Sequence, residues 1–276
     1  MHSNDVYLLA MAALQGVTEL FPISSLGHSI LVPALLNWPI ARDADWFLPF
    51  VVVLHLGTAA ALLVYFWRDW VALIGGWLRA RGGVSNPEAR LLWLLVVGSI
   101  PAGVLGLVLA HRIKALFGGF EFAAVALALN GVLLIAGDML KHRAARADLA
   151  NLGWGRALLV GAAQALELIP GFSRSGATLV AGLGVGLEYA AAARYSFLLA
   201  TPIIAAAGLL EVPKLLHAGV PHGLLGVIGV AGLLSGVCAW ASTWFLMRWF
   251  QGHEVKALRP FGIYCLVFAA VALLVR

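Results

Sequence analysis

The first of two short polar stretches in an otherwise apolar chain carries three kinds of reactive side chain. Gln15 and Glu19 are four residues apart, so an α-helix presents them on one face. A proline then ends that helix, Ser24 and Ser25 follow in the turn, and His28 lies about one helical turn further along. A carboxylate acid or metal ligand, a hydroxyl nucleophile and an imidazole therefore fall within fourteen residues.

The second polar stretch, residues 170–178, has the composition of an anion-binding turn. A proline and Gly171 break the preceding apolar segment, and a new helix is expected directly after them. The free backbone N–H groups and the dipole of a helix N-terminus favour an anion. Arg174 adds a planar fork of donors that matches phosphate oxygens, and hydroxyls come from Ser173, Ser175 and Thr178. This cradle fits a phosphate or a carboxylate, and the donor set favours phosphate.

Each ionisable group in these stretches also has a purely structural interpretation. Glu19 and His28 would then form a satisfied pair within the membrane, and Arg174 would bond backbone carbonyls at a helix end. If the apolar segments around these groups lie in a bilayer, burial there costs each charged group at least about 2.5 kcal/mol. This cost favours a functional role for Glu19, His28 and Arg174. Glu167 mirrors Glu19 in position and serves equally well as a counter-ion of Arg174 or as a catalytic carboxylate. His55, which lies between leucines, is interpreted as a hydrogen-bonded core histidine.

The composition of the chain excludes a water-soluble globular protein. Of its 276 residues, 62% are hydrophobic and 11% are charged, and the mean hydropathy is +0.95. Soluble domains carry roughly 25% charged residues. The same apolar content excludes intrinsic disorder. The two cysteines, Cys238 and Cys265, lie in apolar runs, where a thiol usually acts as a small hydrophobic group and not as half of a disulfide.

Six apolar runs are long enough to cross a bilayer, which requires about 20 residues at 1.5 Å each. The two polar stretches lie between shorter apolar segments, and such broken half-helices are tolerated at membrane depth only where protein or a wet cavity surrounds them. We therefore predict an all-α polytopic membrane protein with six transmembrane helices and two re-entrant helical hairpins. Asn130 and Ser235, inside the spans, are interpreted as interhelical hydrogen bonds, and glycines such as Gly98 and Gly131 as close helix contacts. The predicted spans are 47–66, 91–110, 120–137, 195–210, 223–247 and 260–275.

The two polar stretches resemble each other, because a glutamate stands three residues before a proline in both, and serines follow. Three predicted spans come after each stretch. We therefore expect one membrane domain, 1–276, that contains a first repeat, 1–140, and a second repeat, 150–276. Because each half crosses the membrane an odd number of times, the second half starts on the opposite side, and the repeat is inverted.

Basic residues are distributed unevenly between the two predicted sides of the membrane. With the N-terminus outside, twelve lysines and arginines fall in the cytoplasmic segments, five fall outside, and Arg174 lies in the second polar stretch. Cytoplasmic loops normally carry the excess of positive charge, so this orientation is favoured. The net charge of +5 then reflects contact with anionic lipid headgroups, and a nucleic-acid partner is not expected.

Residues 15–28 and residues 170–178 closely resemble the two signature motifs of the undecaprenyl-diphosphatase family, also called the bacitracin-resistance family. The likeness extends over nearly the whole chain. The resemblance implies a bacterial inner-membrane hydrolase that removes the terminal phosphate of undecaprenyl diphosphate and returns undecaprenyl phosphate to peptidoglycan synthesis. It also implies an active site that faces the periplasm and dependence on a divalent cation, Mg²⁺ or Ca²⁺.

The two motifs and the chemistry of their residues together define three groups of predicted site residues. The catalytic group is Glu19, Ser25 and His28, with Glu19 also a candidate metal ligand; the phosphate-binding group is Ser173, Arg174, Ser175 and Thr178; and the supporting group is Gln15, Ser24, Gly171 and Glu167.

These groups support a mechanistic hypothesis for a phosphatase. Arg174 and its neighbouring donors hold the terminal phosphoryl group, while a divalent cation near Glu19 neutralises developing charge. Ser25 or an activated water attacks in line, and His28 takes or donates the proton. The expected partners are the lipid substrate undecaprenyl diphosphate and membrane lipids, and a homodimer is left open.

One position departs from the pattern that the resemblance leads us to expect. An arginine is expected after the tyrosine of the last span, but Tyr264 is followed by Cys265. The loss of a basic ligand would weaken diphosphate binding unless Arg259 or Arg276 substitutes for it. This departure leaves open a catalytically weakened paralogue. A second alternative, a lipid-phosphate flippase or anion transporter that uses the same cradle, stays open because inverted repeats with half-helices are also the architecture of secondary transporters. A transporter has no evident use for the acid, serine and histidine together, which favours the phosphatase.

Overall fold

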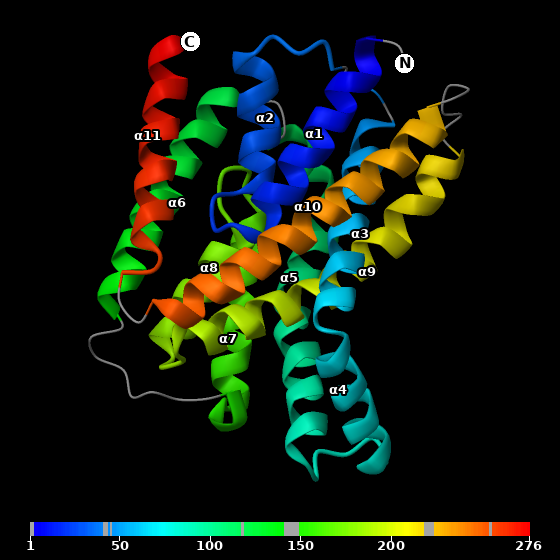
Figure 1. Cartoon of the computed structure of the whole chain (residues 1–276), viewed down its shortest axis with the longest axis vertical. Coiled ribbons are helices and arrows are strands. Elements are labelled where there is room, and N and C mark those ends of the chain that lie inside the picture. Colours follow the sequence, from blue (N-terminus) through cyan, green and yellow to red (C-terminus); the bar gives the residue numbers. More distant parts are fainter. Residues whose placement is uncertain are drawn as a thin grey trace.

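The chain is helical throughout the part that the computed structural model describes, which is residues 3–40, 44, 46–116, 119–140, 149–217, 224–253 and 256–276. These residues form eleven α-helices and two short 3₁₀-helices, and no strand occurs among them. The helices stand roughly side by side in one bundle (Figure 1). The predicted class, an all-α polytopic membrane protein, is confirmed.

Five helices in the described part of the chain are long and apolar enough to cross a membrane. They coincide with five of the six predicted spans, and the sixth is a 17-residue apolar helix, α11. The span expected from residue 195 begins earlier, at Tyr189, and continues through Pro202. The five long helices are α3 (Phe47–Tyr65), α5 (Pro87–Leu116), α6 (Phe120–Leu140), α9 (Tyr189–His217) and α10 (Leu224–Gly252), and α11 is Arg259–Val275.

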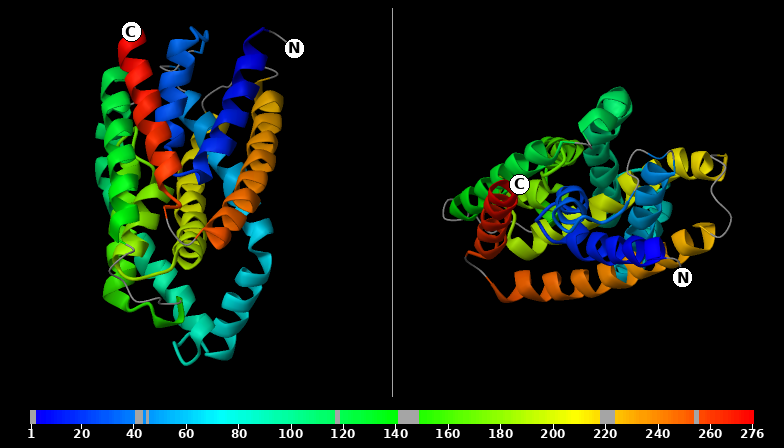
Figure 2. Two further views of the ribbon diagram at one scale, coloured as in Figure 1. Left: turned by 60° about the vertical axis from the view of Figure 1, so that its left-hand side comes forward. Right: turned by 90° about the horizontal axis from the view of Figure 1, so that it is seen from above.

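Two helical hairpins contain the polar stretches. The first hairpin pairs α1 (Ser3–Leu20) with α2 (Ser25–Leu35). The second pairs α7 (Trp154–Gln164), extended by the 3₁₀-helix η3 (Ala165–Leu168), with α8 (Arg174–Gly184). The first hairpin enters from the end of the molecule where both termini lie, and the second enters from the opposite end (Figure 1). Their turns meet in the interior of the bundle (Figure 2).

Glycines let the helices that carry the hairpins approach their neighbours very closely. A Cβ on Gly16 of α1 would overlap the carbonyl oxygen of Ser235 in α10, and a Cβ on Gly161 of α7 would overlap the carbonyl oxygen of Gly98 in α5. Removing side chains from a contact allows two backbones to touch, as in other membrane helix pairs. The inbound helix of each hairpin is therefore seated directly on a membrane-spanning helix.

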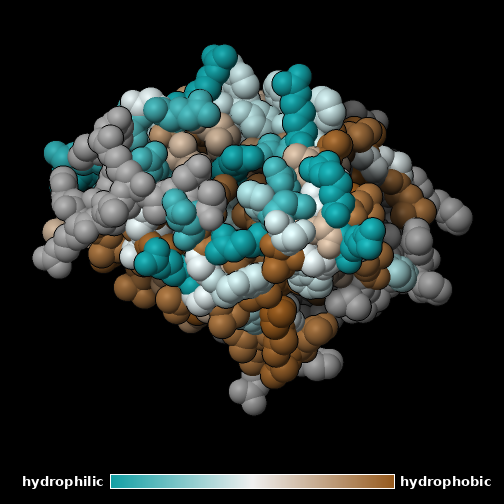
Figure 3. Space-filling view, turned by 90° about the horizontal axis from the view of Figure 1, so that it is seen from below, coloured by the Kyte–Doolittle hydropathy of each residue, from teal (hydrophilic) through white to brown (hydrophobic). Residues whose placement is uncertain are grey.

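An additional helix, α4 (Trp67–Arg79), lies between the predicted spans 47–66 and 91–110, where no helix was predicted. It projects with the beginning of α5 from the end of the bundle opposite the termini (Figure 1). Hydrophilic side chains gather over much of this face, and apolar side chains border them along part of its edge (Figure 3). An exposed ion pair joins Asp69 of α4 to Arg194 of α9. The face is the one for which the charge count predicts contact with the cytoplasm.

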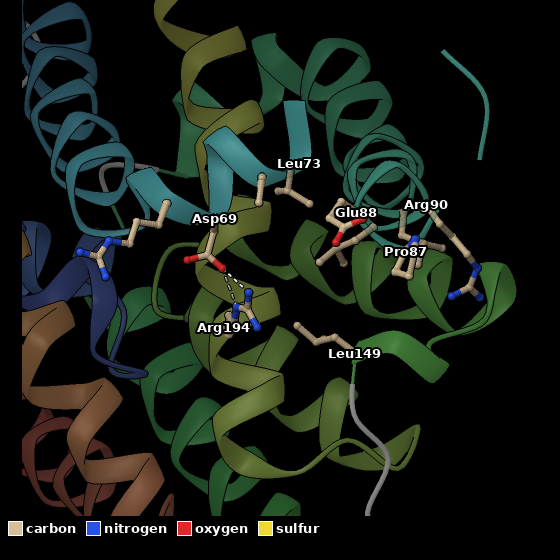
Figure 4. A pocket seen from close by; sticks show the side chains of 11 residues that line it. Asp69, Leu73, Pro87, Glu88, Arg90, Leu149 and Arg194 are labelled. Carbon is tan, nitrogen blue, oxygen red and sulfur yellow. Dashed lines mark hydrogen bonds and ion pairs between the residues drawn. The ribbon is translucent and has the colours of Figure 1, made fainter. Parts of the chain in front are cut away.

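A cavity of about 390 Å³ opens on this face between α4, the beginning of α5 and the beginning of α9. Asp69 and Arg194 lie on one side of it and Glu88 and Arg90 on the other (Figure 4). The Arg90 guanidinium also donates a hydrogen bond to the carbonyl oxygen of Leu152. None of the predicted site residues lines this cavity.

Candidate active site

The tip of the first hairpin presents a carboxylate and a serine to each other. Ser24 has a left-handed backbone φ of 71° and caps α2, because its Oγ accepts a hydrogen bond from the N–H of Gly27 at 3.1 Å. Ser25 is the first residue of α2, and its Oγ donates to Glu19 Oε2 at 2.5 Å. The serine turn therefore both caps α2 and places the Ser25 hydroxyl on the carboxylate of Glu19.

The tip of the second hairpin is built around a glycine and a serine cap. Gly171 has a φ of +108°, and a Cβ there would overlap the carbonyl oxygen of Ala123 in α6, so the turn requires glycine. Ser173 caps α8 by accepting from the N–H of Gly176 at 3.1 Å. Arg174 is the first residue of α8. The helix predicted to follow the proline–glycine break is confirmed, and it begins at Arg174.

The two tips meet through a buried ion pair. Arg174 Nη2 lies 3.1 Å from Glu19 Oε1, and the two side chains are only 2% and 4% exposed. Arg174 Nε lies 3.5 Å from Oε2 of Glu167, whose side chain is 28% exposed. Arg174 of the second polar stretch and Glu19 of the first are therefore in direct contact. Glu167 is a counter-ion of Arg174, as one of its two predicted roles requires.

A histidine that the sequence interpretation placed in the core completes the surroundings of Glu19. His55 Nε2 lies 3.2 Å from Glu19 Oε2, and His55 Nδ1 is 2.8 Å from the carbonyl oxygen of Val51. His55 is hydrogen-bonded as expected, but its partner is the site carboxylate, so the interpretation as a core residue was incomplete. The available signal was an ionisable side chain in the middle of an apolar 19-residue helix.

The predicted catalytic histidine points elsewhere. His28 Nδ1 donates to the carbonyl oxygen of Ser24 at 2.7 Å, which leaves Nε2 to accept from the Tyr264 hydroxyl at 2.8 Å. Its ring stacks on Phe268 with centroids 4.9 Å apart. His28 therefore lies beside the serine turn and faces α11, and its catalytic role stays a prediction.

Several predicted phosphate ligands and supports hold the two turns in this conformation. Ser175 Oγ donates to the carbonyl oxygen of Phe21 at 3.1 Å. Thr178 Oγ1 bonds the carbonyl oxygen of Arg174 at 2.8 Å. Gln15 donates to Glu19 at 3.4 Å and accepts from the Ser235 hydroxyl. Ser235 thus forms the expected interhelical hydrogen bond, and the remaining hydroxyls stay predictions as substrate ligands.

A small cavity lies between the tips, with a volume of about 10 Å³. A site needs roughly 10–15 Å³ to hold one water, so a phosphate enters only when the tips or their side chains move apart. Residues of both tips line it, and they comprise two carboxylates, three serines, one arginine and two apolar side chains: Glu19, Ser24, Ser25, Leu26, Glu167, Phe172, Ser173 and Arg174.

The position where an arginine was expected faces a helix and not the cavity. Cys265 is fully buried, and its Sγ lies 3.5 Å from Asn130 Nδ2 of α6. Arg259 is at the beginning of α11, and Arg276 packs over the ring of Phe120 at 4.6 Å. Neither lines the cavity, so neither replaces the expected ligand in this conformation. Both cysteines are free thiols, as predicted.

The fold and the site define a polytopic membrane protein in which two opposed helical hairpins join an acidic and a basic tip. The family model described as "Bacitracin resistance protein BacA" matches residues 8–271. The chain belongs to this family. It is 58% identical to "Undecaprenyl-diphosphatase 2" of Chromobacterium violaceum over 99% of both chains. It is 46% identical to "Undecaprenyl-diphosphatase" of Granulibacter bethesdensis over 98% of this chain and 96% of the relative.

Proposed function

We propose that this protein is an undecaprenyl-diphosphate phosphatase that releases inorganic phosphate and returns undecaprenyl phosphate to peptidoglycan synthesis, thereby conferring bacitracin resistance. The observation that carries this proposal is the meeting of three groups in one cavity. Arg174 contacts Glu19 at 3.1 Å, and Ser25 donates to the same carboxylate at 2.5 Å. The family membership and the names of the relatives support the same activity.

Substrate binding uses the second tip. The guanidinium of Arg174 exchanges its carboxylate partners for oxygens of the terminal phosphate, which its planar fork can bond in pairs. The N–H groups of Arg174 and Ser175 lie in the first turn of α8, where no intrahelical acceptor exists. They and the helix dipole add to the attraction for the anion. The carboxylates of Glu19 and Glu167 then border the bound phosphate.

The chemical step uses the first tip. Ser25 Oγ–H already donates to Glu19, so the carboxylate is placed to accept this proton as the oxygen attacks phosphorus. The bond to the bridging oxygen breaks, undecaprenyl phosphate leaves, and water then hydrolyses the phosphoserine. In the alternative mechanism, a water bonded to Glu19 attacks phosphorus directly, and phosphate is released in one step. Gln15 and His55 hold the carboxylate in place, while His28 carries a proton only after Tyr264 releases its Nε2.

The donor set fits a divalent cation that is held chiefly by the substrate. No group of three or more metal-binding side chains occurs in the described part of the chain. Mg²⁺ needs only one or two carboxylates when substrate phosphates and waters complete its shell, and Ca²⁺ also takes oxygen ligands. Glu167, the more exposed carboxylate, and Glu19 would hold it. When bound, such a cation neutralises charge on the diphosphate.

The membrane orientation that we propose rests on the distribution of basic residues. We place the protein in the bacterial inner membrane, with the end that carries both termini and the first hairpin toward the periplasm. The hydrophilic face around α4 then lies on the side of the excess positive charge (Figure 3). The contacts of α1 with α10 and of α7 with α5 support the proposed inverted repeats, because each hairpin packs against a span of the other half.

Phosphate release from a long-chain prenyl diphosphate by the purified protein tests the proposal. We expect release with wild-type protein, its loss with chelator, and its loss in Glu19→Gln. Glu121→Gln, at an exposed position in the first turn of α6, is the matched control and should hydrolyse normally. Binding or translocation of the lipid without phosphate release would favour the transporter instead.

A further inference from the structure

The side chain of Asn130 connects the two hairpin tips, although it does not line the cavity between them. It projects from the middle of α6 and is fully buried. Its Nδ2 donates to the carbonyl oxygen of Pro22 in the first turn at 3.0 Å. Its Oδ1 accepts from the N–H of Ser173 in the second turn at 3.0 Å. We propose that Asn130 is a positioning residue that holds the reacting groups of both tips in register, a role that rests on the proposed phosphatase function.

The chemistry of the two partners explains why an amide is required. The carbonyl oxygen of Pro22 can only accept, and the backbone N–H of Ser173 can only donate. One short side chain must therefore offer a donor and an acceptor in a fixed orientation, which Asn130 does. A hydrophobic residue of similar size would leave both buried backbone groups without this partner, at a cost of about 1–3 kcal/mol for each.

The two bonds lie next to the reacting groups in the chain. Ser173 immediately precedes Arg174, so the bond from Asn130 fixes the peptide that begins the phosphate-binding helix. Pro22 lies just before the strained turn at Ser24, which leads directly into Ser25. Asn130 therefore determines how far the serine hydroxyl lies from the guanidinium.

Other contacts show that this register is tight. The tips touch, because a Cβ added to Gly27 would lie 3.1 Å from the Cα of Gly171. Ser175 of the second tip also donates to the carbonyl oxygen of Phe21 in the first. Asn130 differs from these contacts because it ties both tips to a third element, α6, that belongs to neither hairpin. A displacement of about 1 Å at a reacting centre can cost on the order of 10²-fold in rate.

The test compares Asn130→Leu, which removes both bonds at similar volume, with Tyr189→Phe. Tyr189 donates to Asp138, also on α6, at 2.5 Å, so this control removes an interhelical bond from the same helix away from the tips. We expect Asn130→Leu to lower kcat on the order of 10²-fold with less than about threefold change in KM. Tyr189→Phe should lower the melting temperature and leave kcat unchanged. Normal kcat in Asn130→Leu would overturn the proposal.

A second readout is independent of activity. Amide hydrogen exchange, followed by mass spectrometry, should quicken in peptides that cover residues 19–29 and 165–178 of Asn130→Leu, and not in those of Tyr189→Phe. Unchanged exchange in both turns would refute the positioning role. If Asn130→Leu does not fold, Asn130→Ala, which lacks the branched side chain, is measured in the same way. If wild-type protein releases no phosphate, the proposed function fails, and hydrogen exchange still decides whether Asn130 fixes the two turns.

Discussion

Replacing Arg174 by alanine should destabilise the protein and abolish its activity, and the two effects should be separable. At an effective dielectric constant of 20, each carboxylate at 3.1 Å and 3.5 Å attracts the guanidinium by about 5 kcal/mol. Desolvation cancels much of this attraction, and the net cost of breaking a buried pair is about 3–5 kcal/mol. An arginine that clamps a transferring phosphoryl group contributes about 10³-fold or more in rate.

The measurement is a double-mutant cycle in detergent, with unfolding and phosphate release recorded for each variant. Arg174→Ala leaves Glu19 and Glu167 facing each other, so the added change Glu19→Gln should recover part of the lost stability and none of the lost turnover. Arg194→Ala is the control, because its exposed pair with Asp69 contributes about 0–1 kcal/mol. If Arg174→Ala had the stability of the wild-type protein and kept more than a tenth of the wild-type turnover, the role of Arg174 in phosphate binding would be refuted.

Three further substitutions test single contacts. Ser25→Ala should reduce phosphate release at least about 10²-fold and abolish labelled phosphoprotein in acid-quenched reactions; a normal rate would assign the attack to water. His55→Leu removes a charged hydrogen bond worth about 1.5–3 kcal/mol and should lower kcat/KM about 10- to 100-fold; unchanged kinetics would make His55 a packing residue. Cys265→Arg should lower the melting temperature without raising turnover, because this fully buried position faces α6; a clear gain in turnover would instead support the weakened paralogue.

The membrane-spanning helices could be predicted from the sequence because run length and hydropathy are local properties. The bilayer needs about 20 apolar residues wherever a helix crosses it, so five spans were found without any knowledge of their packing. The missed helix, α4, has 13 residues and mixed charge, and it owes its place to packing against α5. A helix of this length is marginal alone, and α4 lacks the long apolar run by which the spans were recognised.

The site could be predicted only where its geometry is local. Glu19, Ser25 and the capping serines follow from helical spacing and turn chemistry, and the structure brings them together. His55 and Asn130 reach the site from α3 and α6, and nothing in their local sequence shows which side chains they contact. His28 is close to Ser25 in sequence, but the direction in which α2 leaves the turn points its ring toward α11.

The glycine contacts of α1 and α7 with neighbouring helices fix how deep the two hairpin tips lie in the bundle, because these contacts are made by backbone atoms. Where the α1 backbone meets α10 at Gly16, and the α7 backbone meets α5 at Gly161, the contact is made mainly by main-chain atoms, which cannot rearrange as a flexible side chain can. A membrane that thickens or thins therefore moves its headgroups relative to these tips, while the tips keep their height in the bundle. Adjustment to lipid bilayers of different thickness falls to the long, flexible tail of the substrate.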